Sequence, residues 1–199
     1  MDLHLTTNHN GKMKNIWSLS TSCKSNPNCE RNAKIEGSIC QKCYAQRQMK
    51  MYKQMHPCYD RNAKILTSEI IPMEDLPSIP VIYFRFESFG DLINWVQCAN
   101  YFNICKKNPQ TKFALFTKNP NIIKECIESG NKKPKNLQII QSSLFIGKPQ
   151  KKAYDFVDKV FTVYADCEGV EINCGARNCF ECHKCYTKSK VEYINEKLK

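Results

Sequence analysis

Short apolar runs alternate with stretches of helical periodicity along most of the chain. Runs rich in β-branched and aromatic residues predict strands, whereas an apolar repeat of three to four residues predicts helices. The predicted strands cover residues 16–20, 80–86, 111–117, 137–143 and 159–165. The predicted helices cover residues 41–71 with a break near His56–Pro57, 91–107 with Asp91 as N-cap, 120–129, and a short piece at 149–158.

This alternation is typical of α/β proteins, in which helices connect parallel strands. We therefore expect a single α/β domain over residues 1–199. Five or six strand–helix units are fewer than the eight of a complete barrel. A partial (β/α) barrel and an open parallel sheet both fit the pattern.

Polar side chains follow each predicted strand. In parallel α/β folds, functional groups collect where strands end, at the carboxyl edge of the sheet. The residues at these positions are Ser20, Thr21, Cys23, Arg85, Glu87, Ser88, Asp91, Thr117, Lys118, Gln141, Ser142, Ser143, Asp166 and Cys167. We expect them to share one edge of the fold.

Nine of the thirteen cysteines fall in two segments, at about residues 20–45 and 165–187. The N-terminal cysteine group has the spacing C-x5-C-x10-C-x2-C and consists of Cys23, Cys29, Cys40 and Cys43. The C-terminal cysteine group consists of Cys167, Cys174, Cys179, Cys182 and Cys185. Cysteines three positions apart crowd one small volume, which favours thiolates that converge on a metal. Both groups begin at strand ends, so we expect them to meet at one edge of the sheet.

The metal can be iron or zinc. In the C-terminal group, the C-x2-C-x2-C run matches the sequence that wraps a [4Fe-4S] cluster, with a distant cysteine as the fourth ligand. Either Cys167 or Cys174 is placed to be that ligand. The N-terminal group also fits an all-thiolate zinc site, although zinc ribbons usually carry two C-x2-C pairs. Three other cysteines, Cys98, Cys105 and Cys126, lie in apolar helical stretches and are expected to pack in the core.

The composition indicates in which compartment the protein works and what kind of partner it binds. The chain has a net charge of +11, which predicts contact with a polyanion such as nucleic acid, although its lysines are scattered. It has no apolar run of transmembrane length and no hydrophobic signal segment at its start, so we expect a cytosolic protein without membrane contact. In a reducing compartment, many cysteines indicate metal binding more often than disulfides.

Three short motifs resemble a known family. They are Cys40-x-x-Cys43-Tyr44-Ala45, Arg85-Phe-Glu-Ser-Phe-Gly90-Asp91 and Phe116-Thr117-Lys118, in this order; Ile16-Trp17-Ser18-Leu19-Ser20 and a cysteine-rich loop precede them, and a cysteine-rich C-terminal segment follows. Over about residues 15–186 the chain resembles the bacteriophage "gene product 88" family. It is more distantly similar to proteins of the radical SAM superfamily, in which a C-x2-C-Tyr-Ala step follows the first strand.

The resemblance implies a radical-SAM-like partial barrel, encoded by a phage or mobile element and located in the host cytosol. It also implies one or two [4Fe-4S] clusters, S-adenosylmethionine as a candidate ligand, and cofactor contacts from Tyr44, Glu87 and Ser142. The superfamily uses a C-x3-C-x2-C spacing, which leaves one iron open, whereas the N-terminal group offers four cysteines. Three thiolates at that centre would permit cleavage of S-adenosylmethionine, and four would block it.

Two functions follow. The first is an iron–sulfur enzyme acting on nucleic acid or protein, in which Arg85 and Lys118 hold an anionic group while Glu87 or Asp91 binds an amine or moves a proton. These four residues could instead form ion pairs that tie strand ends together. The second is a non-enzymatic protein, stabilised by its metals, that binds nucleic acid or a host protein complex.

Overall fold

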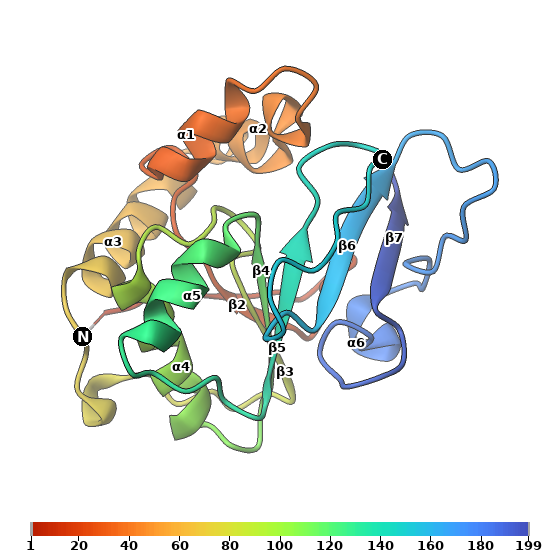
Figure 1. Ribbon diagram of the computed structural model, residues 1–199. Coiled ribbons are helices and arrows are strands. Elements are labelled where there is room, and N and C mark those ends of the chain that lie inside the picture. Colours follow the sequence, from red (N-terminus) through yellow and green to blue (C-terminus); the bar gives the residue numbers. More distant parts are fainter. Residues whose placement is uncertain (1, 199) are drawn as a thin grey trace.

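A computed structural model describes residues 2–198 of the chain. It contains a seven-stranded sheet whose spatial order is the order of the strands in the sequence (Figure 1). The strands are β1 (Leu5–Thr7), β2 (Trp17–Leu19), β3 (Tyr83–Phe86), β4 (Lys112–Thr117), β5 (Leu137–Ser142), β6 (Lys159–Tyr164) and β7 (Tyr193–Lys197). The predicted α/β class with an open, mostly parallel sheet is confirmed.

Only the first strand pair is antiparallel. β1 and β2 form a hairpin in which Leu5 pairs with Leu19, and every later pair from β2 to β7 is parallel. Each parallel strand adds beside the previous one, so the chain crosses over repeatedly in the same direction along the sheet. As a result, the carboxyl ends of β2, β3 and β4 lie next to one another at one edge.

The helices are α1 (Pro27–Ala33), α2 (Tyr44–Met51), α3 (Met55–Ser68), α4 (Trp95–Lys107), α5 (Pro120–Glu128) and α6 (Cys179–Cys182), with short 3-10 helices at Ile39–Lys42 and Met73–Asp75. None of the helices within residues 2–198 combines the length and apolar character needed to cross a membrane.

Three local predictions were wrong. The helix expected to start at Asp91 begins at Trp95, because the side chain of Asn94 caps it by accepting from the Gln97 N–H at 3.0 Å. The piece expected at 149–158 is not helical. The long helical stretch divides at residues 52–54 instead of at the proline, since Pro57 lies in the first turn of α3, where a missing N–H costs no helical hydrogen bond.

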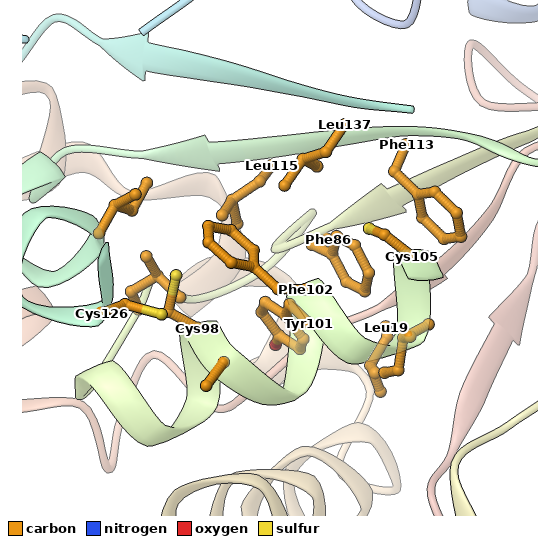
Figure 2. Close-up of a cluster of buried hydrophobic side chains, with 14 of the residues drawn as sticks. Leu19, Phe86, Cys98, Tyr101, Phe102, Cys105, Phe113, Leu115, Cys126 and Leu137 are labelled. Atoms are coloured by element: carbon orange, nitrogen blue, oxygen red, sulfur yellow. The ribbon is translucent and has the colours of Figure 1, made fainter. Parts of the chain in front are cut away.

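The main core lies between the sheet and helices α3, α4 and α5 (Figure 2). Phe86 of β3 stacks on Tyr101 of α4, with ring centroids 4.2 Å apart. Cys98, Cys105 and Cys126 are fully buried in this core, as their apolar surroundings predict. The residues labelled in Figure 2 are Leu19, Phe86, Cys98, Tyr101, Phe102, Cys105, Phe113, Leu115, Cys126 and Leu137.

The opposite face of the sheet carries a second, smaller core. Alternate residues of the same strands point to this side, including Ala114 and Phe116 of β4. The segment from Cys179 to Tyr186 packs against them, so the C-terminal cysteine group covers this face. One part of the candidate site, the C-terminal cysteine group, therefore lies on this second face.

Candidate functional site

Glu87 lies at the carboxyl end of β3 and turns into the protein. Its backbone has φ of 55°, and its side chain is 3% exposed. The carboxylate accepts hydrogen bonds from the Thr21 backbone N–H at 3.2 Å, the Thr21 hydroxyl, the Gln97 amide at 2.7 Å and the Tyr101 hydroxyl. Burial raises the pKa of Glu87 to about 8, against the effect of the bonds from Tyr101 and Thr21, which favour the charged form.

Asp91 is equally enclosed. Its carboxylate accepts from the Thr117 hydroxyl at 2.6 Å, the Lys118 N–H at 2.9 Å and the Leu92 N–H at 2.7 Å. Burial raises its pKa, while the nearby Lys118 lowers it. Glu87 and Asp91, the residues predicted to bind an amine or move a proton, are both buried and hydrogen-bonded within the protein. They join the loops after β2, β3 and β4.

The N-terminal cysteine group gathers at this edge, as predicted. Cys23 follows β2, Cys29 lies in α1, Cys40 lies in the 3-10 helix and Cys43 is the residue before α2. A hydrogen bond with Cys23 lowers the pKa of Cys43 to about 6; burial opposes this, and the N–H groups of Gln46 and Ala45 add to it. Cys29 lies within the electrostatic reach of both Cys23 and Cys40.

Lys118 lies beside these thiols. Burial lowers its pKa, but Cys40, Asp91 and Cys29 outweigh that effect and raise it, so the side chain is a cation. Tyr44, the first residue of α2, donates its hydroxyl to the Ser88 carbonyl while about half of its surface stays exposed. Lys118 and Tyr44 are therefore placed at the thiol group as predicted. Within residues 2–198, buried Ser142 makes no side-chain hydrogen bond to either cysteine group.

The C-terminal cysteine group surrounds a small cavity of about 20 Å³. Four cysteines line it, together with Lys12, His183 and Tyr186; the four are Cys174, Cys179, Cys182 and Cys185. Cys167 does not line it, and its sulfur lies near the Tyr164 carbonyl instead. Of the two candidates for a fourth ligand, the fold thus brings Cys174 to the other three.

The expectation that both groups meet at the carboxyl edge was wrong. After β6 the chain turns back, and α6 lies at the opposite end of the sheet from α1 and α2 (Figure 1). Phe180, His183 and Tyr186 all contact the ring of Tyr83, the first residue of β3, and His183 stacks on it at 5.8 Å. The C-terminal cysteines follow a predicted strand in the sequence, but this position does not indicate that the chain then turns back along the sheet.

Arg85 lies between the two groups, in the middle of β3. Its guanidinium stacks on Phe116, with Cζ 3.9 Å from the ring centroid. Within residues 2–198, its Nε is buried and has no hydrogen-bond partner. Burial lowers the pKa of Arg85, but Tyr44 from one side and Tyr186, Cys185 and Cys179 from the other raise it more.

The alternative ion pairs are not formed. In the part of the chain that the structure describes, no salt bridge joins Arg85 to Asp91 or Glu87 to Lys118. Arg85 is instead a cation whose electrostatic partners are the hydroxyls of Tyr44 and Tyr186 and the thiols of Cys185 and Cys179. An unpaired charge inside a protein is costly.

Lys12 was missed by the sequence interpretation. It lies in the loop of the β1–β2 hairpin, donates to the Cys174 sulfur at 3.3 Å and forms an ion pair with Glu196 of β7. The Lys12 carbonyl also accepts from the Cys179 N–H at 2.7 Å. No local signal marks this lysine, since its partners lie more than 160 residues away in the sequence.

Both cysteine groups consist of free thiols, and thiolates are the residue type that binds iron–sulfur clusters and zinc. Within residues 2–198, no three His, Cys, Asp or Glu side chains are arranged to hold one metal ion. A four-iron cluster is larger than a single ion, so its cysteine ligands stand further apart. Comparisons with known proteins found no matching family model, curated protein or solved structure.

Proposed function

We propose that the chain is an iron–sulfur protein in which Cys174, Cys179, Cys182 and Cys185 hold a [4Fe-4S] cluster. The observation that carries this proposal is the cavity that these four side chains line. When bound, such a cluster supplies one-electron transfer. All-thiolate zinc is the competing occupant, and the C-x2-C-x2-C run of Cys179, Cys182 and Cys185 supports the cluster.

The charges around the cavity support a bound metal. Burial raises the pKa of Cys174, Cys179 and Cys185, so without a metal these thiols are protonated and neutral. Arg85 and Lys12 would then face a site without negative charge. Metal binding deprotonates thiols, and the resulting anionic centre provides Arg85 with a partner and Lys12, which is already paired with Glu196, with a second one.

The scaffold is proposed to be radical-SAM-like, as in the phage "gene product 88" family, with a host-cytosolic location. The sequential order of parallel strands supports this, as does the N-terminal cysteine group beyond β2, the first strand of the parallel series. That group is the candidate for a second cluster and for S-adenosylmethionine. Glu87 cannot contact such a ligand without breaking its hydrogen bonds.

One observation favours a non-catalytic, electron-transferring or partner-binding role. The two carboxylates expected to do acid–base work are sealed from solvent, with Glu87 3% and Asp91 4% exposed. General acid–base catalysis requires a group within hydrogen-bond reach of a substrate. In this role, the exposed basic surface would be the part of the protein that binds a partner.

Anaerobic purification followed by iron, sulfide and zinc analysis tests the proposal. We expect about four irons per chain from the C-terminal site, a broad visible absorption and, after reduction, an electron paramagnetic resonance signal. The signal should be recorded with and without S-adenosylmethionine, since a change would place that ligand at an open iron. A colourless protein with stoichiometric zinc would refute the proposal.

Two single variants sharpen the ligand assignment. Cys174→Ala should lose the cluster of the C-terminal site, whereas Cys167→Ala should keep it, because only Cys174 lines the cavity. Both cysteines are half-buried members of the same segment, which makes them matched controls. Iron loss in Cys167→Ala alone would contradict the assignment.

A further inference from the structure

An open cleft of about 650 Å³ lies next to the four-cysteine cavity. Its walls come from two segments, the loop of the β1–β2 hairpin and the stretch from Cys174 to Glu181. Cys174 and Lys12 line both the cleft and the cavity, so the two spaces adjoin. A volume of this size is typical of sites that bind small molecules or short ligand segments.

The cleft is basic. Its lining includes Lys12, Lys14 and Arg177 against a single carboxylate, Glu181, which accepts a hydrogen bond from the Asn178 amide. Lys14 and Arg177 are exposed, and within residues 2–198 neither side chain forms an ion pair. Unpaired cations on facing walls favour an anionic ligand with several acceptor oxygens.

Backbone donors add to this preference. Gly11 has φ of 68° and lies in the turn closed by the Lys14 N–H on the Gly11 carbonyl. In the described part of the chain, the N–H groups of Gly11 and Gly175 donate to no protein acceptor. Among the described residues that line the cleft there is no Phe, Tyr or Trp, and His9 supplies its aromatic ring, so the cleft offers more groups for recognition of charge than for base stacking.

We propose that this cleft binds a phosphate group, with Lys14 and Arg177 as its side-chain ligands. The phosphate comes from a nucleic-acid strand or from a free nucleotide, and either would lie beside the cysteine centre. The proposal rests on the geometry of the cleft and deepens the proposed function by naming the ligand class. It does not require the cavity to hold iron.

The test uses the full chain, purified anaerobically, with a short fluorescein-labelled single-stranded oligonucleotide and, separately, ATP as probes. The double variant Lys14→Gln/Arg177→Gln should weaken binding of the responding probe by about fivefold for each residue removed. If the oligonucleotide is the ligand, the slope of log K against log salt should become shallower by about 0.7 for each phosphate that the variant no longer neutralises. A response to ATP alone identifies a free nucleotide as the source.

Arg47→Gln/Lys64→Gln is the matched control, since it removes the same charges from exposed positions on α2 and α3. Equal weakening in the two double variants, or no binding of either probe to the wild type, would overturn the proposal. Iron content is measured on the same samples. Binding without iron would defeat the proposed cluster while leaving the phosphate site in place.

Discussion

Replacing Glu87 with glutamine should change how stability depends on pH. The folded protein holds this carboxyl at a pKa of about 8, compared with 4.5 for the free side chain. Between these values the folded state binds a proton that the unfolded state has released. The contribution of this proton to the stability of the folded protein is therefore complete below about pH 4.5, and it decreases as the pH rises toward 8.

The magnitude follows from the linkage relation. One pKa unit corresponds to about 1.4 kcal/mol, so this single group makes unfolding easier by about 2.5 kcal/mol between about pH 5 and pH 7. Glutamine has nearly the shape of the protonated acid and does not titrate. At pH 5 we expect Glu87→Gln to be no more stable than the wild type, because its amide must rearrange the bonds with Tyr101 and Thr21.

Urea unfolding at a series of pH values is the assay. The quantity to follow is the difference in unfolding free energy between variant and wild type, since other titrating groups cancel from it. That difference should move in favour of Glu87→Gln by about 2.5 kcal/mol from pH 5 to pH 7. The exposed Glu168→Gln carries the same charge change and should give a flat difference. A flat difference for Glu87→Gln as well would refute the reasoning.

Two further predictions concern the loop after β3 and the cation beside it. Gly90→Ala should cost about 2–5 kcal/mol of unfolding free energy, because φ is +80° and the new Cβ would lie 2.5 Å from the Thr21 carbonyl oxygen. Gly130→Ala has φ of +91° but open space around it, so chemical denaturation should show the smaller loss of about 1–2 kcal/mol that strain alone produces; equal losses would exclude the close approach to Thr21 as the cause. Arg85→Gln should lower the reduction potential of a cluster at the C-terminal site, because its positive charge favours the reduced, more negative state. Potentiometric titration should show little shift for Phe116→Leu, which removes the stacking partner but keeps the charge; a potential unaffected by Arg85→Gln would rule out this electrostatic role.

The sequence predicted strands β2 to β6 but not the short edge strands β1 and β7, which are only partly buried. β4 contains the apolar run Phe113–Phe116, and such runs identify strands without any knowledge of their neighbours. Helix starts were harder, since Asp91 and Asn94 are both good caps. The choice depends on the tertiary contacts that Asp91 makes with Thr117 and Lys118.

The candidate site was predictable in its residue types but not in its arrangement. Spacing identified the cysteines of both groups, yet it could not choose between Cys167 and Cys174 or place the C-terminal group at the amino end of β3. Those outcomes depend on how the chain returns after β6 and on the bond from Lys12 to Cys174. Likewise, the sequence could not show that Glu87 is buried, because its enclosure depends on Thr21, which follows β2, and on Gln97 of α4.

The link between Lys12 and the C-terminal segment has a consequence for biosynthesis. Lys12 contacts Cys174 and Glu196, so the wall that it contributes to the cavity forms only when the first and last parts of the chain have met. The N-terminal cysteine group spans only residues 23–43 and emerges from the ribosome much earlier. The four-cysteine cavity therefore takes shape later in synthesis than the N-terminal cysteine group, because the segments around Lys12 and Glu196 must both have been made.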